Sequence, residues 1–190
     1  MKIDLGSKPL LAPMPVLIVG TYSADGTPNA MNAAWGGISE ECEISICIDD
    51  THKTAENLKL SGAFTVGVAD VDTMIGADYV GITSANDVEN KMQACGWHAE
   101  KSKHVNAPVF DEIKLTLECQ VKSYDESTCR LVGEIVNVLA DEAIIGKSGK
   151  VDLSLMRPIT YDPFIKAYRV IGDVCGKAFS AGLEIKKNAR

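Results

Sequence analysis

No stretch of this chain reaches the roughly 18 consecutive apolar residues that a membrane-spanning helix needs. The longest apolar patch near the start, residues 10–19, is interrupted by Pro13 and Pro15. It has neither the clean apolar core nor the small-residue cleavage site of a signal peptide. We therefore expect a cytoplasmic protein without a membrane partner.

Basic residues are also in short supply, with 19 Lys and Arg against 26 Asp and Glu and a formal net charge of -7 at pH 7. Proteins that bind nucleic acids neutralise phosphates with clustered Lys and Arg. The basic tail at residues 186–190 is too short to reverse the balance. A nucleic-acid partner is therefore not expected.

The common catalytic signatures are missing. There is no G-x-G-x-x-G after a strand, no G-x-S-x-G and no H-E-x-x-H, and the P-loop-like 146–148 segment has Asp141 where the earlier glycine is required. A bound cofactor would have to carry any difficult chemistry.

Paired cysteines are missing as well. None of the six cysteines forms a C-x-x-C pair, and the metal-like spacing of Cys95 and His98 has no second pair to complete four ligands. We predict no metal site and read the cysteines as buried thiols, with Cys119 in the core.

A length of 190 residues predicts one domain, residues 1–190, with a sizeable core. Apolar alternation predicts strands at residues 16–22, 43–49, 63–69, 113–124, 128–139 and 164–171, and helices at 51–61, 71–80 and 86–94. Residues 113–124 and 128–139 should form a long hairpin. The fold class is therefore mainly β with short α-helices, arranged as a closed or nearly closed barrel. Residues 96–108 form the loosest stretch, which could be a functional loop.

Residues 29–37 are unusually rich in small and amide side chains: Asn29, Asn32, Ala33, Ala34 and Trp35 are followed by two glycines. Small residues let a flat group approach the backbone, asparagine amides can bond its edge, and tryptophan can cover it. A flavin would suit such a surface. The alternative is a small-residue bend within the core.

Residues 50–58 follow a strand and open a helix. Free N–H groups at a helix start, threonine hydroxyls and the Lys53 ammonium make a natural phosphate site. The alternative is a Thr51 N-cap with a solvated lysine. A ring site followed about twenty residues later by a phosphate site indicates a mononucleotide such as FMN.

These segments resemble the flavoredoxin branch of the flavin reductase-like family, whose fold is the FMN-binding split β-barrel. The markers are residues 13–16, 29–35, 52–57, 77–84 with Lys91, and 161–164, so the resemblance covers nearly the whole chain. It implies non-covalent FMN and a homodimer with the flavin near the subunit interface. It also implies cofactor-binding roles: Asn29, Asn32, Ala33, Ala34 and Trp35 at the ring, Lys53 and Thr54 at the phosphate, Lys91 in contact with the flavin, and Phe164 closing the pocket.

Two functions remain open at this stage. One is an FMN-dependent oxidoreductase that takes electrons from NAD(P)H and passes them to a small acceptor. The other is a flavoredoxin-type carrier that relays electrons between proteins, for which an acidic surface would suit a basic partner. No residue is predicted to act as a catalytic acid or base. A positive charge from Lys91 would favour the reduced flavin.

Overall fold

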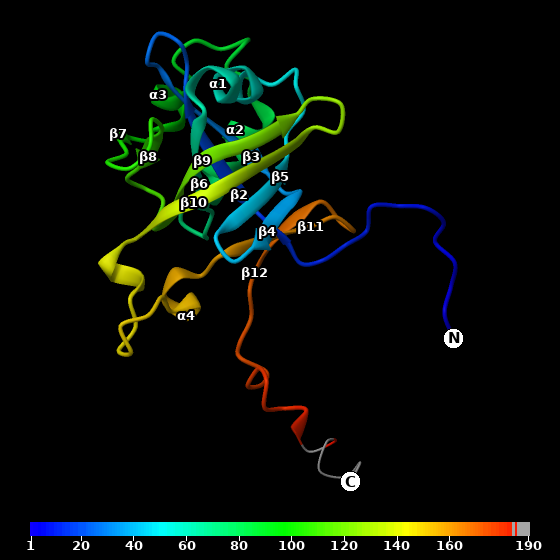
Figure 1. The fold of residues 1–190 in the computed structure, drawn as a ribbon. Helices are drawn as coiled ribbons and strands as arrows, with labels where there is room; N and C mark the ends of the chain where they lie inside the picture. Colours follow the sequence, from blue (N-terminus) through cyan, green and yellow to red (C-terminus); the bar gives the residue numbers. More distant parts are fainter. Residues whose placement is uncertain (184, 186–190) are drawn as a thin grey trace.

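The computed structural model describes residues 1–183 and 185, and its regular elements are mainly antiparallel strands with short helices between them (Figure 1). The strands are β1 Met14–Pro15, β2 Leu17–Tyr22, β3 Pro28–Ala33, β4 Gly36–Glu40, β5 Glu43–Cys47, β6 Ala63–Val68, β7 Ala99–Lys101, β8 Pro108–Phe110, β9 Leu115–Asp125, β10 Arg130–Ala140, β11 Ile159–Asp162 and β12 Ala167–Val170. The helices are α1 Lys53–Ser61, α2 Met74–Ile82, α3 Lys91–Cys95, α4 Leu153–Met156 and the 3-10 turn η1 Glu142–Ile144. The predicted fold class is confirmed.

The main sheet has seven strands in the order β3-β2-β6-β9-β10-β5-β4. Its two edge strands, β3 and β4, follow one another in the chain and are joined only by Ala34 and Trp35. A link this short spans about 11 Å at most. The sheet must therefore curl until its edges nearly meet, which makes it a barrel split between β3 and β4.

Two apolar clusters fill the two faces of this sheet, because side chains alternate along each strand. On β2, Leu17 and Val19 pack into one cluster with α1, whereas Ile18 packs into the other with α2. Each helix thus covers one face. The buried Cys119 lies in the first cluster, as predicted.

The cleanest sequence periodicity corresponds to the longest hairpin. Strands β9 and β10 pair antiparallel over nearly their whole length, with irregularities at Val132/Gly133 and Ile135/Asn137. The predicted strands at 16–22, 43–49 and 63–69 correspond to β2, β5 and β6.

All three predicted helices begin later than expected, α1 by two residues and the other two by more. The Asp70 carboxylate accepts hydrogen bonds from the N–H groups of Asp72 and Thr73 at 3.0 and 2.9 Å, so a turn occupies the predicted first residues of α2. Asn90 has a φ of 58°, which is not helical, so the helix predicted from residue 86 is only α3. Gly62 ends α1 in the left-handed region, which agrees with the predicted helix end at residue 61.

The predicted strand at 164–171 is shorter than expected. The Asp162 carboxylate accepts a hydrogen bond from the Phe164 N–H at 2.9 Å, and Lys166 has a φ of 54°, so the chain turns between β11 and β12. These strands form a separate three-stranded sheet with β1. Phe164 therefore lies in a hairpin turn and is exposed.

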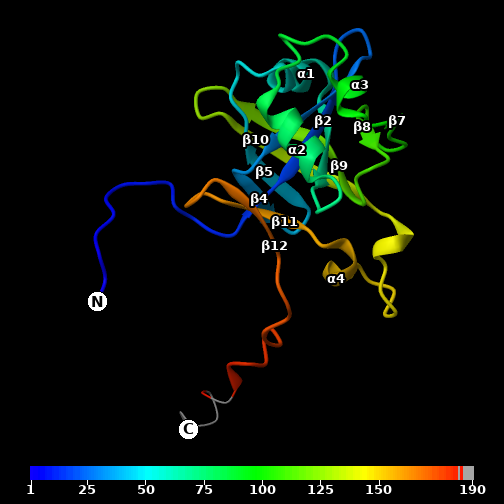
Figure 2. The same cartoon turned by 180° about the vertical axis from the view of Figure 1, so that it is seen from behind.

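The two ends of the chain extend away from the barrel, and Figure 1 and Figure 2 agree on this from opposite sides. Their apolar side chains contact little of their own chain: the largely exposed ones are Met1, Ile3, Leu11, Val174 and Phe179. Among the described residues, no helix is long and apolar enough to cross a membrane.

Candidate functional site

The free edge of β3 lies between two helices. Asn29 projects toward α1, where its amide N–H donates to the Thr54 hydroxyl at 3.1 Å. Asn32 projects toward α2, where its amide donates to the carbonyl of Ala77 at 3.1 Å. The small-residue segment is therefore an edge strand whose amides connect it to both helices.

A pocket of about 180 Å³ opens along this edge, and we call it the inner pocket. Its lining comes from β3, the start of α1, the end of α2 with the following loop, and α3. The residues are Asn29, Met31, Asn32, His52, Lys53, Thr54, Val80, Gly81, Ile82, Thr83, Ser84, Ala85 and Lys91. Five of the predicted cofactor residues, Asn29, Asn32, Lys53, Thr54 and Lys91, thus line one pocket.

Lys91 is 5% exposed, although it carries an ammonium group. Its Nζ donates to the carbonyls of Ala30 at 2.7 Å and Val80 at 2.9 Å. None of the ion pairs found in residues 1–183 and 185 involves it. Burial lowers the pKa of Lys91 to about 8, so at neutral pH a buried positive charge faces the pocket without a carboxylate beside it.

Asn29 presents the opposite polarity. It is 3% exposed, and its Oδ1 is a buried acceptor with no partner among the described residues. Buried acceptors are normally paired, because an unpaired one loses its bond to water. The inner pocket therefore offers one acceptor and one cation to a ligand, which suits a molecule that carries an N–H donor and a negative charge.

The N-terminus of α1 lies on the same pocket. No side chain caps this helix, so the alternative of a Thr51 N-cap is wrong: the Thr51 hydroxyl donates instead to Asp49 Oδ1 at 2.6 Å. The Asp49 carboxylate accepts hydrogen bonds from the N–H and hydroxyl of Thr51, and these bonds lower the pKa of the Asp49 carboxyl group. The uncapped helix end, with Lys53 and Thr54, can therefore meet an anion.

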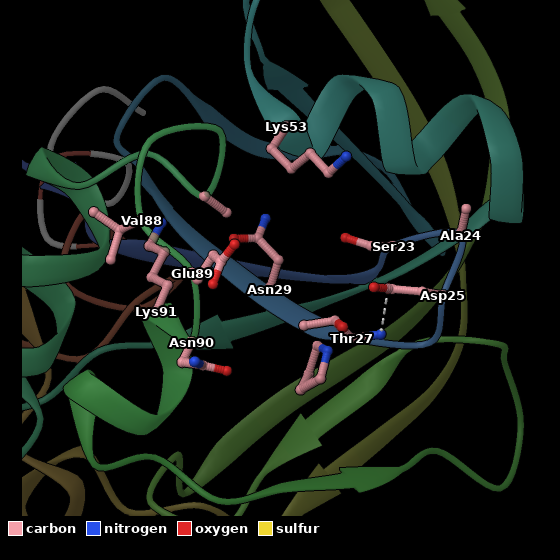
Figure 3. Close-up of a pocket in the computed structure, with 12 residues that line it drawn as sticks. Ser23, Ala24, Asp25, Thr27, Asn29, Lys53, Val88, Glu89, Asn90 and Lys91 are labelled. Atoms are coloured by element: carbon pink, nitrogen blue, oxygen red, sulfur yellow. Dashed lines mark hydrogen bonds between the residues drawn. The ribbon is translucent and has the colours of Figure 1, made fainter.

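A second pocket, of about 530 Å³, adjoins the first, and we call it the outer pocket. Figure 3 shows Lys53 and Asn29 pointing into it from one side and the Asp25 turn bounding the other. Asn29, Lys53, Ala85 and Lys91 line both pockets. The outer pocket is additionally lined by Ser23, Ala24, Asp25, Thr27, Pro28, Val88, Glu89 and Asn90.

The remaining predicted residues lie apart from the inner pocket. Ala33 is 6% exposed and packs into the first apolar cluster, so its side chain points away from the edge. Ala34 lines a small hollow beside Asn32, Tyr161 and Tyr168. Trp35 is 59% exposed and lines a hollow with the N-terminal segment, so it is no core residue. Phe164 lines none of these hollows.

Several lining residues have no signal in a single sequence. The turn at 23–27 and the stretch 85–90 are polar loops by composition, and only their folding brings them beside β3. The loop at 96–108, predicted to be loose, contains β7, the first residue of β8 and the buried Trp97, and it lines neither pocket.

The cysteines differ from the expectation of six buried thiols. Cys119 is buried, but Cys42, Cys47 and Cys175 are exposed. Burial raises the pKa of Cys95 to about 11 and that of Cys119 to about 12, which keeps both as thiols. Within the described part of the chain, no group of three or more His, Cys, Asp or Glu side chains could hold a metal ion.

Comparisons with known proteins bear on this site. The sequence profile described as "Flavin reductase like domain" matches residues 11–157. Flavoredoxin of Desulfovibrio vulgaris (Miyazaki F) is 33% identical with a TM-score of 0.91, over 96% of this chain and 100% of that chain. Flavoredoxin from Methanosarcina acetivorans is 25% identical with a TM-score of 0.85, over 97% and 98%.

A more distant similarity concerns the fold alone. The FMN-binding domain of a flavin reductases-like enzyme from Shewanella baltica OS155 is 22% identical with a TM-score of 0.78, over 88% of this chain and 91% of that chain. The split-barrel fold is therefore confirmed. No curated protein matches the chain. The profile match spans well over half of the residues, and this chain belongs to the flavin reductase-like family.

Proposed function

We propose that this protein binds FMN non-covalently in the inner pocket and acts as an FMN-dependent redox protein. The observation that carries the proposal is the presence of two buried polar groups in one pocket: the Lys91 ammonium, which has carbonyl partners but no carboxylate, and Asn29 Oδ1, which has no partner among the described residues. A planar anionic ligand with N–H donors satisfies both.

Different residues of the chain would bind different parts of FMN. Lys53 and Thr54, at the uncapped start of α1, would hold the phosphate. Asn29, Asn32 and the backbone of Ala33 and Ala34 would face the ring along the β3 edge, with Trp35 beyond them. The Lys91 ammonium would lie beside the flavin as a positive charge. Phe164 of a second subunit would cover the flavin. FMN itself supplies the electron-transfer chemistry.

We further infer a homodimer. The chain exposes 12083 Å², whereas a compact monomer of 20.4 kDa exposes about 8,800 Å². The difference of about 3,000 Å² is more than one partner contributes to most stable interfaces. The extended ends, with exposed Leu11, Val174 and Phe179, account for part of this surface.

Two uses of the flavin are proposed. The first is NAD(P)H-dependent reduction of a small acceptor, as the family membership suggests. The second is electron transfer between proteins, which is favoured by the similarity to two proteins named flavoredoxin and by the net charge of -7.

The test begins with the visible spectrum of the purified protein and chromatographic identification of the cofactor released by heat. We expect FMN; release of FAD, or a colourless protein that FMN cannot reconstitute, would contradict the proposal. Anaerobic titration with NADH and NADPH then separates the two uses. Steady oxidation of either nucleotide with a small acceptor indicates the enzyme, and no reaction with either indicates the carrier.

A further inference from the structure

Residues 170–176 form a free strand edge, which we call the open edge. It begins at the end of β12, the last strand of the β1-β11-β12 sheet, so one side of that strand has no neighbour. The Ile171 N–H still donates to the Pro158 carbonyl at 3.1 Å, but residues 172–176 make no backbone–backbone hydrogen bond within the described part of the chain. An unpaired edge of this kind is a template for another strand.

An apolar hollow of about 510 Å³ lies along the open edge and shares no residue with the inner or outer pocket. Its large apolar side chains, all exposed, are Leu153 on α4 and Val170, Ile171 and Val174 on the edge. Arg157 and Asp173 add one charge of each sign to the lining. Folded proteins take up extended segments at such places, because the edge bonds the backbone of the segment and the hollow receives its alternate side chains.

Residues 1–5 of the same chain have the complementary character. Met1, Ile3 and Leu5 alternate with Lys2 and Asp4, which is the pattern of a strand with one apolar face. All five are exposed, and their N–H and C=O groups bond no other backbone group among the residues that the structure describes. The chain therefore contains a strand-like segment without a sheet and a sheet edge without a strand.

The two segments do not meet within one chain. Figure 1 and Figure 2 both show residues 1–5 pointing away from the barrel and from the C-terminal part that carries the open edge. They lead into β1, which lies at the opposite edge of the three-stranded sheet from β12. Residues 8–11 are already engaged, because they line the hollow with Trp35. A second copy of the chain is therefore the natural source of the missing strand.

We propose that residues 1–5 of a second copy add to the open edge as an antiparallel strand, so that the two subunits exchange these segments. The inference rests on the homodimer of the proposed function and names the contact that joins its subunits. A twofold axis makes the exchange reciprocal, because each subunit gives one strand and receives one. Five residues in a strand extend about 17 Å and seven extend about 23 Å, so the edge is long enough.

Charge favours one register for this pairing. The neighbouring pairs β1–β11 and β11–β12 are antiparallel, and the added strand would continue that sheet in the same way. Lys2 and Asp173 carry opposite charges, and neither forms an ion pair with any residue in 1–183 or 185. Opposite charges on facing residues stabilise a strand pair. The register therefore places Lys2 opposite Asp173.

The apolar side chains fit the same register, in which Ile3 lies opposite Gly172 and Leu5 lies opposite Val170. Apart from its chain neighbours, no heavy atom would lie within 4 Å of a Cβ on Gly172, so the space that Ile3 needs is open. Residues that face each other across a strand pair share one face of the sheet, so Ile3 and Leu5 lie on the same face as Val170. The exchange thus buries apolar side chains that each chain alone exposes to water.

Disulfide trapping tests the pairing. One full chain carries Lys2→Cys and the other Asp173→Cys, both with Cys175→Ser, and the two are co-expressed and mildly oxidised. We expect a disulfide-linked pair of chains in non-reducing electrophoresis, because facing residues in antiparallel strands have Cβ atoms about 4.5–5.5 Å apart. In the control, Lys166→Cys replaces Asp173→Cys. Lys166 is exposed in the β11–β12 turn and does not line the hollow, so this pair should stay unlinked.

The strength of the dimer provides a second measurement. Ile3→Asp should weaken the dimer about ten-fold or more in analytical ultracentrifugation, because it places a charge where the hollow receives an apolar side chain. Ser7→Asp adds the same charge to the same exposed arm, two residues beyond the proposed strand, and should leave the dimer as strong as in the wild type.

The outcomes separate this inference from the homodimer itself. A wild-type dimer that gives no Lys2–Asp173 cross-link, or that Ile3→Asp weakens no more than Ser7→Asp does, would overturn the exchange and leave the homodimer standing. A wild-type monomer would contradict both. If the two cysteines link only when they are placed in one chain, residues 1–5 fold back onto their own edge and the exchange is wrong.

Discussion

The Lys91 ammonium lies 2.7 Å from the carbonyl oxygen of Ala30 on the edge strand β3. A second hydrogen bond, 2.9 Å to the carbonyl of Val80, ties the same group to α2. An ammonium has three donors, and carbonyl dipoles neutralise only part of its charge. One donor and most of a positive charge therefore remain for whatever occupies the inner pocket.

Lys91→Met should weaken FMN binding by about 10- to 100-fold, because hydrogen bonds to charged groups contribute roughly 1.5–3 kcal/mol. Quenching of FMN fluorescence on titration with apo-protein measures the affinity. Lys150→Met, in an exposed loop outside both pockets, is the matched control and should bind FMN normally. Equal affinities for the two variants would remove Lys91 from the flavin site.

The same lysine should give the apo-protein an unusual pH dependence. Its pKa is about 8 in the folded chain and 10.5 when it is unperturbed. Below about pH 8 both states hold the proton and the folded state carries the full burial penalty. Between about pH 8 and 10.5 the unfolded state holds more protons, so the stability rises with pH.

Denaturant unfolding of the apo-protein at several pH values between 7.5 and 10 measures this effect. The rise should total roughly 3 kcal/mol at most, and it is obtained as the difference between the wild type and Lys91→Met, in which it should be missing. Bound FMN should also abolish it, because an anion beside Lys91 raises its pKa again. Parallel curves for the wild type and the variant would contradict the assignment.

The sequence predicted the strands best where alternation is long. Residues 113–124 and 128–139 each alternate over about a dozen positions, and they form β9 and β10 as expected. The predicted element boundaries were wrong where an aspartate side chain accepts hydrogen bonds from backbone N–H groups. Asp70 delays α2 by bonding two N–H groups, and Asp162 turns the chain at Phe164. Such Asx turns depend on geometry that no periodicity reveals.

Only part of the site could be predicted from the sequence, for a similar reason. Asn29 and Lys91 lie sixty-two positions apart in the chain, and only pairing of β3 at the sheet edge and the packing of α3 against it bring both to one pocket. Their residue types were informative, because a buried amide and a buried lysine need partners. The acids of the outer pocket, Asp25 and Glu89, carry no such signal, since solvated loops contain the same residues.

Trp35→Ala should weaken FMN binding several-fold with little loss of stability. A buried tryptophan cut to alanine costs about 3–5 kcal/mol, but Trp35 is 59% exposed, so we expect less than about 1 kcal/mol. FMN titration and apo-protein unfolding under one buffer condition measure the two effects. Unchanged affinity would mean that Trp35 faces the N-terminal segment alone and does not reach the ring.

The flavin-loaded protein should have twice the chain mass of 20.4 kDa in light scattering at micromolar concentration. The reason is the excess exposed surface and the apolar ends, which a second subunit would cover. If Phe164 reaches the flavin of its partner, Phe164→Ala should weaken FMN binding without changing the apo-protein's stability, because the side chain is 57% exposed. A stable, flavin-loaded monomer would contradict the inferred homodimer.

Asn29 and Asn57 provide an internal comparison for the ring site. Each is buried, each donates its amide N–H to a threonine hydroxyl, at 3.1 Å to Thr54 and 3.0 Å to Thr21, and each leaves Oδ1 without a partner among the described residues. Only Asn29 lines the pockets. The chain thus contains two similar amides, one facing a ligand site and one enclosed between α1 and β2.

Asn29→Leu should therefore lower FMN affinity by about ten-fold, since it removes the buried acceptor that a flavin N–H would meet. Asn57→Leu should leave FMN affinity unchanged. Both replacements strand a threonine hydroxyl and remove an unpaired acceptor, so both should shift the apo-protein's stability by similar amounts, within about 1 kcal/mol of each other. Fluorescence titration and denaturant unfolding of the two variants measure this. If Asn57→Leu weakens FMN as much as Asn29→Leu does, the loss comes from the packing of α1 and not from a contact with the ring. If neither variant lowers FMN affinity, Asn29 Oδ1 does not contact the flavin. Of the two buried polar groups in the inner pocket, only the Lys91 ammonium would then remain to bind it.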